Sequence, residues 1–71
     1  MTILDVCVEV LKESDRPLAA DELCSEIERR KLYSFNAKSP SSIIRGTLRK
    51  HLRGSPPYRV RQVDSRRFEA V

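Results

Sequence analysis

The segment Ser39–Arg53 restricts the fold more than any other part of this 71-residue chain. Both of its ends are marked, because Ser39 and Pro40 suit the N-cap and first helical position and Gly54 is a usual helix stop. At about 3.6 residues per turn, one face is mostly apolar and holds Ile43, Ile44, Thr47, Leu48, His51 and Leu52. The opposite face holds Ser42, Arg45, Arg49 and Arg53. The pattern predicts an amphipathic helix that packs on one side and presents arginines on the other.

Two further helices are predicted ahead of this segment. Thr2 and Asp5 have the spacing of a capping box for a first helix, which ends at residues 14–17. Residues 18–20 begin extended and lead into a second helix over about residues 20–32. That helix has acids in its first turn and bases in its last, as the helix dipole favours.

The C-terminal residues predict a β-hairpin. Residues 58–62 alternate with a period of two, Asp64 and Ser65 suit a turn, and residues 66–71 return. Arginines at alternate positions point outward, and the side chains expected to face inward are Tyr58, Val60, Phe68 and Ala70. Three helices followed by a basic hairpin are the order of a winged helix-turn-helix. We therefore expect a mainly α fold with a small β-hairpin (α+β), as one domain over residues 1–71.

The basic side chains gather in the second half of the chain. The whole chain has 14 Lys and Arg against 10 Asp and Glu, a formal net charge of +4. Residues 1–32 hold five basic and eight acidic side chains, net −3, whereas residues 33–71 hold nine basic and two acidic, net +7. Such a split indicates a surface that faces a polyanion, and double-stranded DNA is the expected partner.

The expected DNA contacts follow helix-turn-helix geometry, in which the second helix of the motif enters the major groove. The side chains expected at base edges are Ser41, Ser42, Arg45 and Arg49. Those expected at phosphates along the same helix are Lys38, Ser39, Lys50 and Arg53. Those of the hairpin, expected on a phosphate or in the minor groove, are Arg59, Arg61, Arg66 and Arg67.

The basic surface also has a simpler interpretation as a solvated face. In that case Arg49 or Arg53 can pair with acids of the first two helices, and isolated surface charges carry little energy. Two basic elements, the helix and the hairpin, favour a polyanion over this alternative.

The aromatic side chains allow a second alternative, stacking on single-stranded nucleic acid. A chain of this length with only four aromatic residues needs them in its core. We therefore expect Tyr58, Phe68 and Phe35 to be structural, whereas the role of Tyr33 stays open.

No catalytic or metal-binding group is expected. Cys7 and Cys24 fall on apolar helix faces, which favours buried free thiols over the alternative, a disulfide. With one histidine, they make a poor set of metal ligands. His51 also lies on an apolar face, and two glycines are too few for a phosphate-binding loop. We therefore predict that the protein is not an enzyme and needs no metal or cofactor.

Five stretches spanning nearly the whole chain resemble one family. They are Val10–Glu13, Arg16–Leu23, Lys38–Pro40 with the apolar positions after it, Tyr58–Val60 and Arg66–Phe68. Their order is similar to that of the HARE-HTH domain, a winged helix-turn-helix of ASX-like chromatin proteins, restriction endonucleases and the delta subunit of bacterial RNA polymerase. Two positions depart from the family pattern: Ala19 replaces a hydroxyl cap, and Glu69 stands where glycine is usual.

The resemblance implies DNA binding in transcription regulation or chromatin. Polymerase-subunit members use the fold to contact protein, so the alternative is an adaptor that docks an acidic surface of RNA polymerase or a regulator. No apolar run approaches the roughly 20 residues of a membrane span, and the start lacks the features of a signal peptide. We therefore expect a cytoplasmic protein, nucleoid-associated in a bacterium or nuclear in a eukaryote, with no small-molecule substrate.

Overall fold

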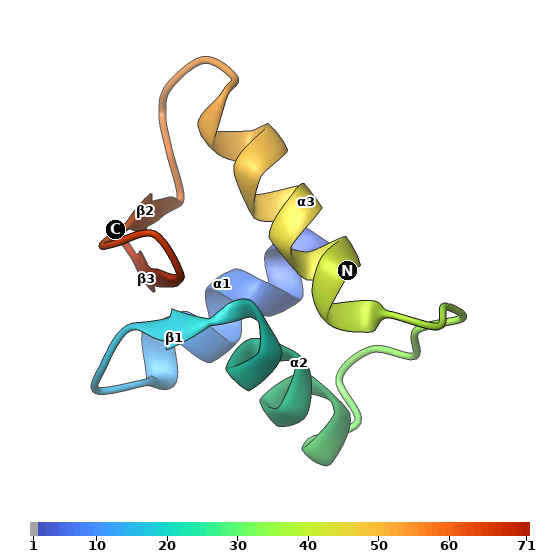
Figure 1. Cartoon of the computed structure of the whole chain (residues 1–71). Helices are drawn as coiled ribbons and strands as arrows, with labels where there is room; N and C mark the ends of the chain where they lie inside the picture. The colour runs from blue at the N-terminus through green and yellow to red at the C-terminus, as the bar shows by residue number, and fades with distance from the viewer. Residues whose placement is uncertain (1) are drawn as a thin grey trace.

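The computed structural model describes residues 2–71, which form three helices and three short strands. In chain order they are α1 (Ile3–Glu13), β1 (Leu18–Ala19), α2 (Ala20–Arg29), α3 (Pro40–Leu52), β2 (Val60–Gln62) and β3 (Arg67–Ala70). Figure 1 shows the strands β2 and β3 on one side of the helices, with residues 53–59 arching from the end of α3 to β2. This is the α+β winged-helix fold that the order of the motifs predicts.

The sheet is antiparallel and has the strand order β1-β3-β2. β2 pairs Val60 with Ala70 of β3, so the predicted hairpin is confirmed, although both strands are shorter than predicted. β1 lies on the other edge of β3, with Leu18 opposite Phe68. The extended start of β1 is predicted from the sequence but its pairing is not, because two residues show no alternation that would reveal it.

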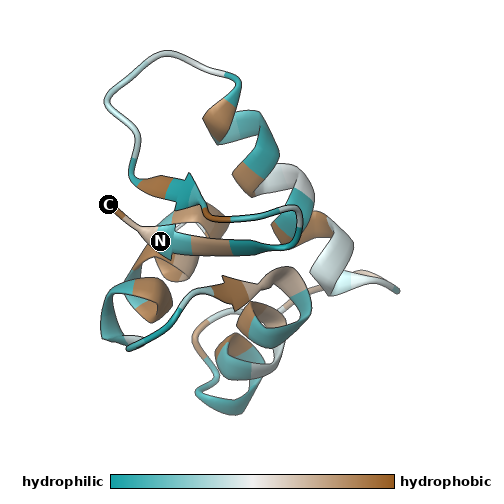
Figure 2. Ribbon diagram, turned by 60° about the vertical axis from the view of Figure 1, so that its left-hand side comes forward, coloured by the Kyte–Doolittle hydropathy of each residue, from teal (hydrophilic) through white to brown (hydrophobic). Residues whose placement is uncertain are grey.

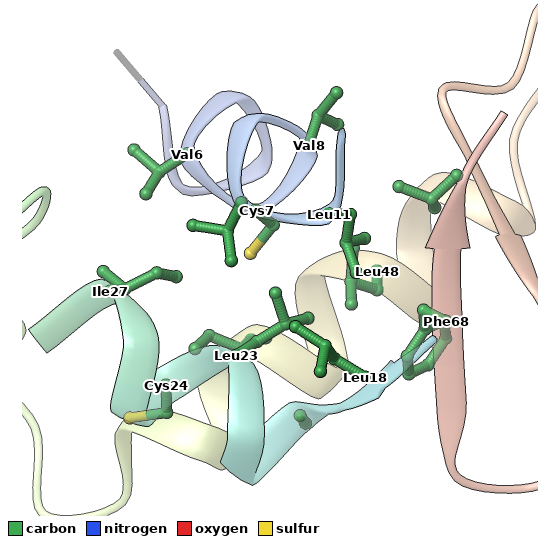
Figure 3. Close-up of a cluster of buried hydrophobic side chains, with 14 residues drawn as sticks. Val6, Cys7, Val8, Leu11, Leu18, Leu23, Cys24, Ile27, Leu48 and Phe68 are labelled. Atoms are coloured by element: carbon green, nitrogen blue, oxygen red, sulfur yellow. The ribbon is translucent and has the colours of Figure 1, made fainter. Parts of the chain in front are cut away.

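One apolar core joins the helices to the sheet (Figure 3). Cys7 from α1, Leu23 from α2 and Leu48 from α3 have no exposed surface, and Phe68 enters from β3 with 2% exposed. The inward position predicted for Phe68 is therefore confirmed. Truncating a side chain of this kind, as in Leu48→Ala, typically costs about 2–5 kcal/mol of stability.

Both cysteines are free and buried, as predicted. Burial raises the pKa of the Cys7 and Cys24 thiols to about 11. The Cys24 thiol also donates to Glu28 Oε1 at 3.3 Å. Both thiols are therefore protonated at neutral pH and fill space as small hydrophobic groups.

The helix starts agree with the predicted caps in part. At α1, Thr2 Oγ1 accepts from the Asp5 N–H and Asp5 Oδ2 accepts from the Thr2 N–H, both at 3.1 Å, which is the predicted capping box. At α3, Pro40 begins the helix as predicted, but the Ser39 side chain forms no cap bond and instead pairs with Ser42 Oγ at 2.9 Å. The Ser39 backbone, with a ψ of 78°, departs from the extended conformation that N-caps adopt.

The predicted end of the second helix is wrong by about one turn. α2 ends at Arg29, and Lys31 takes a left-handed backbone with a φ of 55°. Glycine or asparagine usually marks such a stop, so a lysine there gives no warning in the sequence. Leu32 is then 46% exposed, while Tyr33 and Phe35 pack against the core with ring centroids 5.0 Å apart.

Two apolar residues assigned to packed positions are partly exposed instead. Ile43 lies at the edge of the packed face of α3 and is 36% exposed, whereas Ile44 at its centre is fully buried. Tyr58 is 38% exposed because it precedes β2, and it contacts the end of α3 rather than the core. Its ring stands edge-on to His51, and its hydroxyl donates to the Gly54 carbonyl at 2.8 Å.

Candidate nucleic-acid interface

The exposed side of α3 carries a basic face made of Arg45, Arg49, Lys50 and Arg53. Ile44 and Leu48 hold the helix in this orientation, because both are fully buried on its opposite side. Within residues 2–71, none of the four basic side chains forms an ion pair. The alternative in which they pair with acids of α1 or α2 is therefore not realised. Those acids pair with other arginines, namely Arg16, Arg29 and Arg30.

Most arginines of the hairpin, by contrast, are paired with carboxylates of the same chain. Arg59 binds Asp5 of α1, with 2.6 Å between Nη1 and Oδ1. Arg61 binds Glu69 across the hairpin, and Arg67 binds Asp64 at 2.8 Å. Among the four arginines predicted to contact DNA from the hairpin, Arg66 is the one without an ion pair in residues 2–71.

These pairs perturb the carboxylates that take part in them. The hydrogen bond from Arg59 lowers the pKa of Asp5 to about 2, with further help from the capping bonds of Thr2. Backbone N–H groups of Arg66 and Arg67, followed by the Arg67 side chain, lower the pKa of Asp64. Both carboxylates are therefore charged at neutral pH and neutralise part of the hairpin.

The hairpin and α3 meet at a groove of about 410 Å³. In Figure 2 the hairpin runs across the molecule with its turn toward α3. Arg45 and Arg49 of α3 line the groove on one side, and Gln62, Ser65 and Arg66 line it from the hairpin. The fold thus brings together basic residues that lie about 20 positions apart in the sequence.

The three helices, the basic face of α3 and the hairpin beside it are the parts of a winged helix-turn-helix. Over residues 1–71 the sequence matches the model of the HARE-HTH family, described as the HTH domain of ASXL proteins and restriction endonucleases. The chain belongs to the HARE-HTH family. HARE-HTH is a helix-turn-helix DNA-binding domain and not a catalytic one, although restriction endonuclease members carry it alongside other domains. Comparisons with curated proteins and with solved structures found no match.

Two further properties of this HARE-HTH domain concern sites of other kinds. The helices within residues 2–71 are all too short or too polar to cross a membrane. The same residues contain no cluster of three His, Cys, Asp or Glu side chains that could hold a metal ion.

The start of α3 in the HARE-HTH domain holds the remaining predicted contacts. Lys38, Ser39 and Ser42 are exposed, whereas Ser41 is half-buried. Ser39 and Ser42 bond to each other through their hydroxyls, so each offers the remaining capacity of its hydroxyl to a ligand. Lys38 forms no ion pair within the described part of the chain.

The sequence interpretation missed three residues of this region. Gln62 and Ser65 line the groove, and the period of two, which places Gln62 on the same side as Val60, is a usable indication for the first of them. His51 links α3 to the hairpin, because its Nε2 accepts the backbone N–H of Arg59 at 2.9 Å. No sequence pattern indicates that contact, since it depends on the path of residues 53–59.

Proposed function

We propose that this domain binds duplex DNA with α3 in the major groove and the hairpin on the backbone or in the minor groove. The observation that carries the proposal is the division of charge: acids of α1, α2 and the hairpin are paired, while the basic face of α3 has no partner within residues 2–71. Guanidinium groups without a partner suit bidentate contacts to phosphate and guanine.

The proposal gives each part of the surface a separate role. Base edges are assigned to Ser41, Ser42, Arg45 and Arg49, and phosphates along α3 to Lys38, Ser39, Lys50 and Arg53. In the hairpin, Arg66 is free to bind, whereas Arg59, Arg61 and Arg67 must first leave a carboxylate. Exposed ion pairs are weak, so this exchange is possible, but it makes these three arginines lesser contributors. We propose a setting in transcription regulation or chromatin, in the bacterial cytoplasm or the eukaryotic nucleus, with residues 1–71 as one domain.

A duplex-binding experiment at two salt concentrations tests the proposal. Fluorescence anisotropy with mixed-sequence duplexes is expected to show binding that weakens steeply as salt rises, because bound cations are released from the phosphates. Arg45→Ala and Arg49→Ala should each weaken binding by about tenfold. Lys12→Ala is the matched control, because Lys12 is exposed on α1, outside the groove, and forms no ion pair within residues 2–71. An absence of binding by the unmodified protein at low salt would contradict the proposal.

A second candidate function is docking to an acidic surface of RNA polymerase or a regulator. Two apolar side chains next to the basic residues favour it, because Ile43 and Val63 are 36% and 47% exposed and suit a protein surface. The charge reversal of Arg45 and Arg49 to Glu distinguishes the two functions. It should abolish binding of purified RNA polymerase in a pull-down if docking is the function, and duplex binding if DNA is the ligand.

A further inference from the structure

The groove between α3 and the hairpin combines basic side chains from two elements. Arg45 and Arg49 come from α3, and Arg66 comes from the turn of the hairpin. This side of α3 differs from its outermost line, where Gly46 and Arg53 are exposed away from the hairpin groove. A ligand in the groove therefore contacts both elements at once.

The charge of the groove is strongly positive when it is empty. Its three arginines have no carboxylate partner within residues 2–71, and the acid that lines the groove with them is Asp21 at the start of α2. Like charges gathered around a space of about 410 Å³ repel one another. An anion in that space removes the repulsion and accepts hydrogen bonds from each guanidinium.

Asp64 fixes the part of the hairpin that carries Arg66. Its Oδ1 accepts the backbone N–H groups of Arg66 and Arg67 at 2.8 and 2.9 Å, and its Oδ2 accepts from the Arg67 side chain at 2.8 Å. The Val63 N–H closes the same turn by donating to the Arg67 carbonyl at 2.9 Å. The backbone of Arg66 is therefore held in place while its guanidinium is left free to bind.

We infer that this groove binds a single phosphate group, held between Arg45 and Arg49 of α3 and Arg66 of the hairpin. The inference rests on the proposed function for the source of the phosphate, a DNA strand that passes between α3 and the hairpin. A free diphosphate presents the same chemistry and fits the same groove. Asp21 opposes either ligand, and its charge limits the affinity.

Double-mutant analysis of duplex binding tests whether the arginines share one phosphate. Arg45→Ala and Arg66→Ala should each weaken binding by about tenfold, as expected for the loss of one charge-assisted contact. The double variant should lose far less than the product of the two, because each contact depends on the other. Lys12→Ala should stay within about twofold of the unmodified protein, and thermal melts verify that every variant folds.

Substitution of the opposing acid gives an effect of the opposite sign. Asp21→Asn should strengthen duplex binding by several-fold, since it removes the negative charge from the groove. Asp15→Asn is its control, because Asp15 is an exposed acid that does not line this groove. Equal effects of the two substitutions would overturn the inference, because they would reflect net charge alone.

A second arm separates the groove from the duplex. Inorganic pyrophosphate is titrated into the isotope-labelled protein, and the amide signals of Arg45, Arg49 and Arg66 should shift together with one apparent Kd. Pyrophosphate binding without duplex binding would support the groove and contradict the proposed function. Duplex binding that Arg66→Ala leaves at the level of Lys12→Ala, or a double variant that equals the product of the singles, would overturn the groove and leave the proposed function standing. Binding of neither ligand overturns both.

Discussion

At the scale of single residues, Gly46 is the clearest mismatch between sequence and local structure. It lies in the middle of α3 on its exposed side, with an ordinary helical backbone. A glycine in a helix interior costs about 1 kcal/mol relative to alanine. An added Cβ would meet nothing within 4 Å, so no contact inside the domain requires glycine there. A partner that approaches the backbone of α3 closely would explain it, which is the situation that major-groove insertion creates.

Gly46→Ala is therefore expected to change stability and binding in opposite directions. The free energy of unfolding should rise by about 0.5–1 kcal/mol, because alanine favours the helix and meets no obstruction. Duplex affinity should fall several-fold if the backbone of α3 lies against the groove floor. Ser25→Ala on the exposed side of α2 is the control, with a gain in stability and no change in affinity. Urea titration and anisotropy measure the two quantities, and an unchanged affinity for Gly46→Ala would argue against close approach.

His51 is the second residue whose role is local and testable. It accepts the Arg59 N–H and lies edge-on to Tyr58, so it joins the end of α3 to the start of the hairpin. His51→Phe keeps the aromatic contact and removes the acceptor. Stability should fall by about 0.5–1.5 kcal/mol, the usual value of one such hydrogen bond. Urea titration measures it, and amide exchange at Arg59 should accelerate; an unchanged exchange rate would show that the bond does not form in solution.

At the scale of elements, some helix starts can be predicted from the sequence and ends and pairings less well. The start of α3 follows from Pro40, and that of α1 from the spacing of Thr2 and Asp5, because caps are local. The end of α2 depends on Lys31 adopting a positive φ, which its residue type does not indicate. The pairing of β1 depends on the position of β3 nearly fifty residues later.

The hairpin turn supplies a prediction at the same scale. Asp64→Asn and Asp64→Ala remove the same charge, but only asparagine keeps an oxygen that can accept the N–H groups of Arg66 and Arg67. Duplex affinity should therefore be several-fold higher for Asp64→Asn than for Asp64→Ala, because the turn that places Arg66 is kept. Anisotropy measures the difference. Equal affinities would show that the turn does not position Arg66 for binding.

At the scale of the whole molecule, the charge split is visible in the sequence but its distribution over the surface is not. The excess of basic residues after residue 33 predicts a basic surface, and the basic face of α3 confirms the part of that surface that follows helical periodicity. Which arginines are free depends on contacts across the fold. Arg59 is neutralised by Asp5, 54 positions earlier, and no local pattern can indicate such a pair. The sequence therefore predicts the fold and the basic helix better than it predicts which hairpin arginines can bind.

The Asp5–Arg59 pair ties the first helix to the hairpin and makes the stability of the domain depend on pH. The pKa of Asp5 is lowered from 3.8 to about 2 in the folded protein, chiefly by the Arg59 hydrogen bond. A lowered pKa means that the pair stabilises the fold above the unfolded pKa and that this contribution disappears as the pH falls from about 4 to about 2. Asp5→Asn should therefore be less stable than the unmodified protein at pH 6 and should show a shallower loss between pH 4 and 2. Urea titrations across this range measure both proteins. Glu9→Gln changes an exposed acid of the same helix that forms no ion pair in the described residues, so it should keep the pH dependence of the unmodified protein. A loss in Asp5→Asn that runs parallel to that of the unmodified protein would show that the pair contributes nothing in solution.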